Sequence, residues 1–190
     1  MLGLVTASLA GCSAGAGSPH GAAVAAGTVT CAQVTGTVSF APPLTPSGRS
    51  AETTTFDLHP AKCSTSGSKV KVVTGATARA VVHGTSSCSS GLSSKPSVVD
   101  VRWSPASVGR SVATFPGFSV TANNVGDAGF VFPRVGRSSV VTGSFPGTDH
   151  GADSTMSVYS LQSIATMLAS CEQGAGLSSI PLVVGALTLG

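Results

Sequence analysis

Apolar and polar residues alternate most regularly between Lys69 and His83. Valine or alanine occupies nearly every even position of this stretch, whereas Lys69, Arg79 and His83 lie at odd positions. A period of two is typical of a β-strand that buries one face and exposes the other. We therefore expect one long strand here, with His83 on its exposed face.

Shorter stretches with the composition of strands follow, and turn-forming residues separate them. The separators are Ser-Gly, Ser-Pro, Asn-Asn and Pro-Gly sequences, which favour turns. Trp103 has the same parity as Val99 and Val101, so we expect its ring in the core. The pattern predicts strands at Ser97–Ser104, Val112–Ala122, Gly129–Phe132, Ser138–Phe145 and Thr155–Tyr159.

One segment near the C-terminus has helical spacing instead. Its apolar residues recur at intervals of three or four and so share one helix face: Leu161, Ile164, Leu168 and Cys171. The candidate caps are Ser160 or Ser163 at the start and Gly174 at the end. We interpret the apolar stripe as a contact with the core and not as a cofactor site.

The stretch Leu177–Leu189 returns to the spacing of a strand. Its most apolar part, Ile180–Leu189, is about half as long as a membrane-spanning helix, and Pro181 and Gly185 interrupt it. We expect a buried final strand, and a membrane tail is the alternative.

Together these segments make eight or nine short strands, with turns between them and one short helix near the C-terminus. This arrangement predicts a mainly β protein with the fold of an antiparallel β-sandwich. An eight-stranded barrel is the alternative. The tripeptide Phe-Pro-Gly occurs at 115–117 and 145–147, where we expect strands to end in a bend.

The composition fits such a fold and argues against one class of partner. Only 9% of the residues are charged, far below the usual proportion, and Val, Thr, Ser, Gly and Ala dominate. The net charge of +3 comes from basic residues that are dispersed along the chain. Because no basic run is interleaved with aromatic residues, we expect no nucleic-acid partner.

The N-terminal residues resemble the signal of a bacterial lipoprotein. Leu9-Ala10-Gly11-Cys12 matches a lipobox, and the apolar stretch Leu2–Leu9 precedes Cys12 without any Lys or Arg. We interpret residues 1–11 as a truncated signal peptide whose true start lies upstream. Cys12 is then the first residue of the mature protein and carries a diacylglycerol.

The residues that follow Cys12, up to position 27, are almost all Ala, Gly and Ser. Such a segment has too little bulky apolar surface to offset its ordering entropy, so we interpret residues 12–27 as a flexible tether. We expect a single β domain at 28–190, which Cys12 anchors to the membrane outside the cytoplasm, at the cell surface.

The cysteine count agrees with lipidation of Cys12. The chain has five cysteines, an odd number, and removing Cys12 leaves four, which is enough for two disulfides. No Cys-x-x-Cys sequence and no Cys/His spacing typical of zinc sites occurs, so we expect neither a metal nor another cofactor.

The expected register of the first two strands selects one disulfide pairing from three. If Val38 pairs with Phe56 in antiparallel strands, Cys31 lies opposite Cys63, and both fall on the polar face. The remaining pair would join a loop to the end of the helix. We therefore predict the disulfides Cys31–Cys63 and Cys88–Cys171.

Several short sequences carry a resemblance that covers most of the chain. They are Thr30-Cys31, Val34-Thr35-Gly36-Thr37-Val38, Pro42-Pro43-Leu44, Gly143-Ser144-Phe145 with Gly147 and Asp149, Leu168-Ala169 with Cys171, and Leu189-Gly190. In these, the domain from about Thr28 to Gly190 resembles a group of uncharacterised exported proteins of high-GC Gram-positive bacteria. The resemblance implies a surface location and disulfides, and it brings no known activity.

Asp149, His150 and Asp153 form the strongest cluster of candidate catalytic residues. Such side chains could make a general acid/base pair or a calcium site in a loop. The EF-hand spacing is absent, however, and Asp and Gly are also the residues that turns prefer. We therefore favour a turn, and we expect that the protein is not an enzyme.

Three functions fit these features. The first is a non-enzymatic, lipid-anchored envelope protein of structural or interaction type, whose partners are the membrane and an envelope polymer or another envelope protein. The second is an envelope module that binds a small apolar molecule or a carbohydrate. The third is a hydrolase centred on Asp149 and Asp153. An apolar cavity of roughly a few hundred cubic ångströms would favour the second function over the first.

Overall fold

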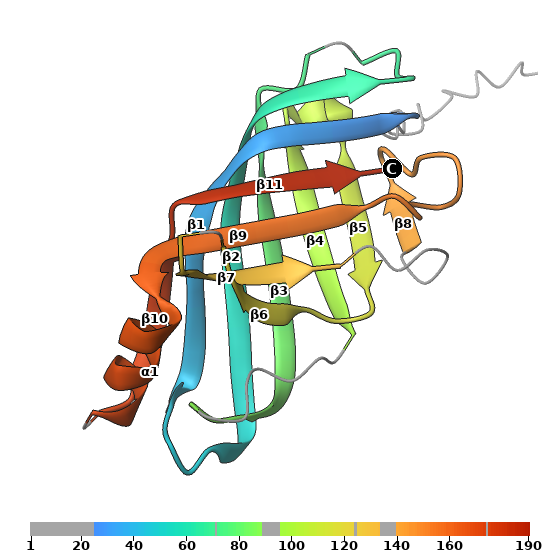
Figure 1. Ribbon diagram of the computed structural model, residues 1–190. Helices are drawn as coiled ribbons and strands as arrows, with labels where there is room; N and C mark the ends of the chain where they lie inside the picture. Colours follow the sequence, from blue (N-terminus) through green and yellow to red (C-terminus); the bar gives the residue numbers. More distant parts are fainter. Residues whose placement is uncertain (1–24, 71, 89–95, 124, 134–139, 174) are drawn as a thin grey trace, which may run out of the picture.

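Antiparallel strands that form one sheet make up most of the molecule (Figure 1). The computed structural model describes residues 25–190 except 71, 89–95, 124, 134–139 and 174. This part of the chain contains the helix α1 (Ile164–Glu172) and the 3-10 helix η1 (Ala106–Val108). Its strands are β1 (Thr28–Leu44), β2 (Arg49–Ser66), β3 (Gly75–Ser86), β4 (Ser97–Ser104), β5 (Arg110–Phe115), β6 (Ser119–Ala122), β7 (Asp127–Phe132), β8 (Val140–Gly143), β9 (Thr155–Ser163), β10 (Leu177–Leu182) and β11 (Val184–Leu189).

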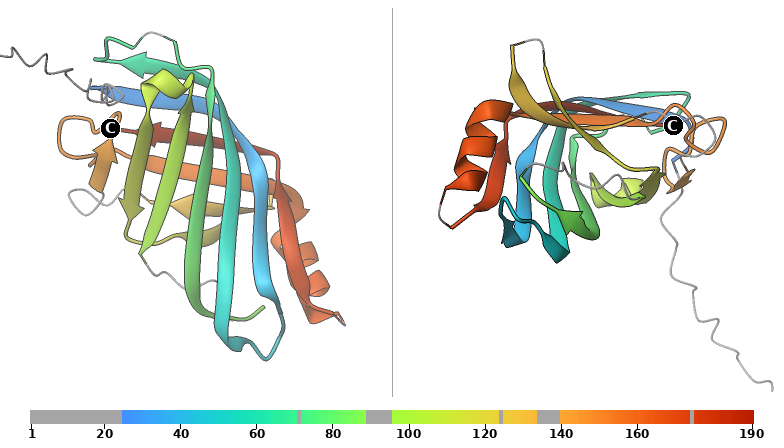
Figure 2. Two further views of the ribbon diagram at one scale, coloured as in Figure 1. Left: turned by 180° about the vertical axis from the view of Figure 1, so that it is seen from behind. Right: turned by 60° about the horizontal axis from the view of Figure 1, so that its bottom comes forward.

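The sheet folds over on itself, so that its two halves face each other as layers (Figures 1 and 2). The strand order is β6-β7-β9-β11-β1-β2-β3-β4-β5-β8, and β10 also pairs with β1. The strand β1 connects the two halves, because one of its edges pairs with β2 and the other pairs with β11 at its start and with β10 in its later part. Among the described strands, β6 and β8 end the order and the sheet stays open. The structure therefore confirms the antiparallel sandwich and not the barrel.

Aromatic rings fill the centre of the space between the layers. Phe56 of β2 contacts Phe130 and Phe132 of β7, with ring centroids 5.3 Å apart in both pairs. The ring centroid of Phe118, directly before β6, lies 5.2 Å from that of Phe56. These rings meet Phe56 edge to face, which is a favourable geometry for aromatic pairs. Because β2 and β7 are in different layers, this cluster holds the layers together.

The register of β1 against β2 is the predicted one, with Val38 opposite Phe56 and Cys31 opposite Cys63. The expectation that both cysteines lie on a polar face is wrong, because Cys31 is completely buried. The buried positions of β1 change from odd to even just after Cys31. At this point the ladder is interrupted, and Lys62 of β2 has a φ of 52°. This irregularity turns both parts of β1 toward the core.

The predicted strand from Lys69 to His83 begins later than expected, because β3 starts at Gly75. The backbone of Val70 bonds side chains instead of a strand ladder: its N–H donates to Ser68 Oγ (3.1 Å), and its carbonyl oxygen accepts from Thr65 Oγ1 at the end of β2 (2.7 Å). His83 is exposed as predicted.

The predicted strand Val112–Ala122 is two strands, β5 and β6, which lie at opposite ends of the sheet order. Pro116 and Gly117 separate them, and proline cannot donate a hydrogen bond to a ladder. The second Phe-Pro-Gly sequence likewise lies directly after β8, where Gly147 has a φ of 66°. Both copies therefore mark the end of a strand, as predicted.

The predicted final strand Leu177–Leu189 is also divided, into β10 and β11. The break is at Val183, whose N–H donates to the Tyr159 carbonyl oxygen of β9 (2.9 Å). The break lets β10 and β11 pair with different parts of β1. The expected burial is confirmed at Leu182, Leu187 and Leu189.

A buried hydrogen-bonded chain anchors Trp103, which lies in the core as predicted. The indole Nε1 donates to Ser111 Oγ (2.7 Å), and Ser111 donates in turn to the Ser144 carbonyl oxygen. The Phe145 ring meets the indole edge to face, with centroids 5.2 Å apart. Burial of the indole therefore leaves its N–H satisfied.

The helix α1 is the short helix that the sequence predicts, although it starts later than the first apolar residue of the stripe. Its N-cap is Ser163, whose Oγ accepts from the Thr166 N–H (3.1 Å). Leu161 belongs to β9 and is 74% exposed, so its assignment to the helical stripe is wrong. The candidate cap Gly174 lies outside the described residues.

The folded domain includes residues that the sequence assigns to the tether. Ala25 is buried, and its carbonyl oxygen accepts from the Phe145 N–H (2.6 Å). Gly27 accepts from the Gly147 N–H (3.2 Å) in the same way. The predicted flexible tether is therefore wrong at 25–27, where backbone hydrogen bonds fix the chain. Its remaining residues, the predicted signal peptide and Cys12 lie outside the described residues. No helix in the described part of the chain has the length and apolar character needed to cross a membrane.

Candidate ligand-binding site

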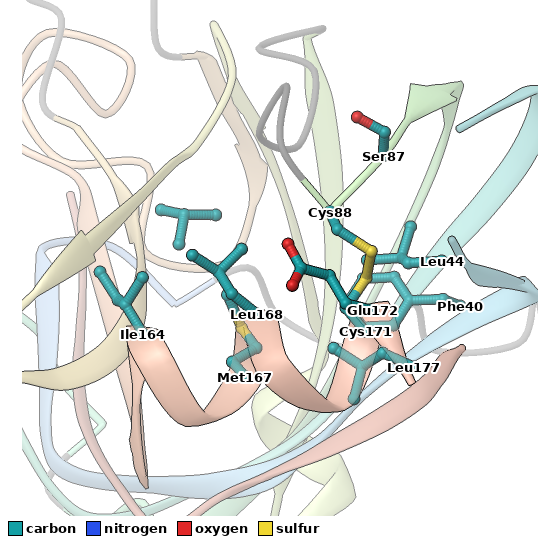
Figure 3. Close-up of a pocket in the computed structure, with 11 residues that line it drawn as sticks. Phe40, Leu44, Ser87, Cys88, Ile164, Met167, Leu168, Cys171, Glu172 and Leu177 are labelled. Carbon is teal, nitrogen blue, oxygen red and sulfur yellow. A yellow bond between two sulfur atoms is a disulfide. The ribbon is translucent and has the colours of Figure 1, made fainter. Parts of the chain in front are cut away.

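An apolar pocket lies beneath α1 at one end of the sandwich (Figure 3). Its volume is about 450 Å³, within the range of pockets that hold small molecules. Four segments of the chain that are far apart in sequence contribute to its walls, together with α1. The lining residues are Phe40, Leu44, Ser87, Cys88, Val120, Ile164, Met167, Leu168, Cys171, Glu172 and Leu177.

The wall formed by α1 consists of the apolar stripe that the sequence identifies. Ile164, Met167 and Leu168 lie on the side of the helix that faces the pocket (Figure 3). Each of them stays partly exposed, whereas Cys171 is buried. The prediction of a core contact is therefore only partly correct: Met167 and Leu168 pack against the core and also line a cavity.

The opposite wall is part of the sheet. Phe40 and Leu44 extend from the inner face of β1, and Leu177 of β10 pairs with Leu44. All three side chains are buried. This wall rests on paired strands, so it is firmly positioned, and the helix covers it from the other side.

A disulfide fixes the helix over this wall. Cys88, directly after β3, is bonded to Cys171 in the last turn of α1. The Cys88 N–H also donates to the Thr45 carbonyl oxygen (3.2 Å), which ties the same segment to the end of β1. The bridge spans 83 residues of sequence, so it joins parts of the chain that local structure does not hold together.

Both disulfides are the predicted pairs, Cys31–Cys63 and Cys88–Cys171. Disulfides form and persist in oxidising compartments and are rare in the cytoplasm. The two bridges therefore indicate that the folded domain resides outside the cytoplasm.

One carboxyl group lines the pocket, and a second is buried on the neighbouring strand β2. Glu172 is the charged member of the lining, and its carboxylate lies between Leu168 and the disulfide (Figure 3). Glu52 of β2 is only 3% exposed and lies on the inner face, two residues from Thr54, which pairs with Phe40.

The two oxygens of the Glu52 carboxyl group differ. Oε1 accepts from Thr54 Oγ1 (2.7 Å), whereas Oε2 is buried and has no hydrogen-bond partner within the described part of the protein. A buried polar atom without a partner costs about 1–3 kcal/mol. An unpartnered buried atom in a native structure calls for an explanation, such as strain, a catalytic role, or a bound water or ion.

The candidate catalytic residues Asp149, His150 and Asp153 lie together in a turn and are exposed. The turn is closed by backbone hydrogen bonds, from the Ala152 N–H to the Asp149 carbonyl oxygen (3.2 Å) and from the Val141 N–H to the His150 carbonyl oxygen (2.7 Å). His150 has a φ of 54° and is followed by Gly151. This geometry fits the turn interpretation, and exposed side chains lack the buried setting that usually adapts a catalytic acid or base.

Two further hollows are shallow and lie on the outer faces of the sheet. One, of about 520 Å³, is lined by polar side chains that include the ion pair Arg79–Asp57 (3.5 Å). The other, of about 590 Å³, surrounds Tyr159 and Val184. Both have more polar linings than the pocket beneath α1, so they suit a small apolar molecule less well.

The residues described here contain no group of three or more His, Cys, Asp or Glu side chains arranged to hold a metal ion. Comparison of the chain with protein-family models, with curated proteins and with solved structures gave no match.

The sequence identifies only part of this site. The helical stripe and the Cys88–Cys171 pair are both visible in it, and both belong to the pocket. No pattern in the sequence marks Phe40, Leu44 or Glu172 as site residues. Apolar residues that line a cavity have the same spacing as residues that fill a core, so no local pattern separates the two.

Proposed function

We propose that this protein is a non-enzymatic module of the cell envelope that binds a small apolar molecule in the pocket beneath α1. The observation that carries the proposal is an apolar cavity of about 450 Å³ that a helix, a sheet and a disulfide enclose. Burial of apolar ligand surface contributes about 25 cal/mol per Å², so a pocket with this apolar lining favours an apolar ligand.

The cavity favours a binder of small apolar molecules over a structural module and over a carbohydrate-binding module. A purely structural module has no need of it, because filling it with larger side chains would stabilise the fold. A carbohydrate site usually presents exposed aromatic faces and many hydrogen-bonding groups, whereas this lining is mainly aliphatic. The interpretation as a small-molecule binder is therefore the better supported one.

Lipid attachment at Cys12 is the second part of the proposal. The lipobox supports it, and so does the even number of cysteines, all of them in disulfides, that remains without Cys12. Intact-mass analysis of the protein from its native host tests this part. We expect a mature N-terminus at Cys12 with an added acyl mass. A mature protein that begins at another residue would contradict the anchor and leave the pocket unaffected.

Binding is tested by titrating the purified protein with a neutral fluorescent naphthylamine. We expect one molecule bound per chain, with fluorescence that rises as the probe leaves water. In the variant Leu168→Trp the larger side chain occupies the pocket, and the affinity should fall by about tenfold or more.

The matched control is Leu161→Trp, which adds the same ring on an exposed position of β9 that does not line the pocket. This variant should bind the probe as the natural protein does. Equal affinity of the natural protein and Leu168→Trp would show that the probe binds elsewhere, and the proposal would then be wrong.

A further inference from the structure

We propose that the natural ligand is an amphiphile with a non-acidic, hydrogen-bond-donating head group, an alcohol or an amine, and that the pocket discriminates against carboxylic acids. This inference rests on the proposed function, since it concerns the ligand of the same pocket. It follows from the kind of polar groups that accompany the apolar lining.

The first of these groups is Glu172 at the mouth. It is the one charged side chain among the described lining residues, and the other members of the lining are apolar apart from Ser87. Its carboxylate lies beside the disulfide and Leu168, where the head of a ligand whose tail lies between α1 and β1 would emerge (Figure 3). A carboxylate attracts an ammonium group, accepts a hydrogen bond from a hydroxyl group and repels another carboxylate.

The second group is Glu52, which does not line the pocket but lies on the inner face of the neighbouring strand β2. Its carboxyl group lies beside the Thr54 that pairs with the lining residue Phe40. Its Oε2 atom has no hydrogen-bond partner in the part of the structure that is described. An alcohol or an amine can donate to a carboxyl oxygen, whereas an ionised fatty acid has no proton to donate. A head group that reached Glu52 would therefore belong to the class that Glu172 favours.

The experiment compares decylamine, decanol and decanoate, which share one apolar tail and differ in the head group. Each compound displaces the fluorescent naphthylamine from the natural protein, at low salt and below the concentration at which it forms micelles. We expect decylamine to bind most tightly, decanol next and decanoate most weakly. Exposed ion pairs are weak, so each step through Glu172 should be about two- to fivefold.

Two variants assign this order to Glu172. In Glu172→Gln the difference between decylamine and decanoate should shrink, and in Glu172→Lys the order should reverse. Asp149→Asn is the matched control, because it removes one negative charge from an exposed turn outside the pocket. This control should keep the order of the natural protein.

A further variant, Glu52→Gln, tests the buried group, and its circular dichroism spectrum verifies the fold. We expect a smaller preference for decylamine than in the natural protein. If that variant fails to fold, the Glu172 variants still decide the inference. Decanoate that binds as tightly as decylamine to the natural protein, or an order that Glu172→Lys leaves unchanged, would overturn it. Failure of all three compounds to displace the probe would instead contradict the proposed function.

Discussion

The centre of the sandwich and the end beneath α1 are built on the same strands but are filled differently. At the centre, Phe56 meets three other phenylalanine rings edge to face, and the layers are in direct contact. At the end, β1 faces a helix across a cavity of about 450 Å³. Its walls are mostly aliphatic, and a disulfide takes the place of direct packing.

This difference separates stability from function. Protein interiors are normally packed as densely as organic crystals, and cavities in them cost free energy. The centre follows this rule, and so it should determine how stable the fold is. The end beneath α1 is not densely packed, and the Cys88–Cys171 bridge keeps the helix in place there. This end should therefore determine what the protein binds.

The largest expected effect comes from removing the ring at the centre. Phe56→Ala should lower the free energy of unfolding by about 3–5 kcal/mol, because it leaves a cavity between rings that pack on one another. Unfolding in urea, followed by circular dichroism, measures the loss. A loss below about 1 kcal/mol would mean that the ring cluster does not hold the layers together.

Removal of the bridge at the other end should affect stability and binding together. Replacing Cys88 and Cys171 by alanine should cost about 4 kcal/mol and weaken binding of the naphthylamine probe, since α1 is no longer tied down. Replacing Cys31 and Cys63 in the same way is the control. It should also destabilise the fold but leave the affinity of the folded protein unchanged. An unchanged affinity after loss of Cys88–Cys171 would contradict its role at the pocket.

Two methionines permit the same substitution in both regions. Met156 is 1% exposed in the core, whereas Met167 is partly exposed and lines the pocket. Met156→Ala should cost about 2–5 kcal/mol, and Met167→Ala less than about 1 kcal/mol, because the cavity beside Met167 already exists. Urea unfolding of both variants measures the difference. Equal losses would mean that the end is packed as tightly as the centre.

A small and local effect is expected at the start of α1. Ser163→Ala removes the side-chain oxygen that accepts from the Thr166 N–H, so stability should fall by about 1 kcal/mol. Hydrogen exchange of the amides in α1 should accelerate more than exchange in β2. Uniform acceleration across the protein would show that the cap affects the whole fold and not the helix alone.

The sequence predicts the centre of this molecule better than the end. Alternation and register lead directly to the β1–β2 pairing and, through it, to the Cys31–Cys63 bridge. The second pairing, Cys88–Cys171, follows by elimination. The Phe-Pro-Gly sequence at 115–117 indicates the break at Pro116, whereas the break at Val183 could not be predicted as readily, because it depends on which part of the sheet receives the next strand.

The pocket is less visible in the sequence, for a physical reason. Ile164, Leu168 and Cys171 have the spacing of a core helix, and whether such residues fill a space or border it depends on the side chains opposite them. The side chains opposite the helix include Phe40 and Leu44, which belong to a strand more than 100 positions before α1. Glu52 looks like an ordinary polar strand residue, and only its burial distinguishes it.

The most direct test of the account is methyl-resolved NMR of the protein during titration with decanol. The chain has two isoleucines, one at the pocket (Ile164) and one in the core (Ile180), and the described methionines Met167 and Met156 are divided in the same way. We expect the methyl signals of Ile164 and Met167 to shift in proportion to occupancy, and those of Ile180 and Met156 to stay nearly unchanged. Shifts of equal size in both pairs, or none at Ile164 and Met167, would contradict a binding site beneath α1.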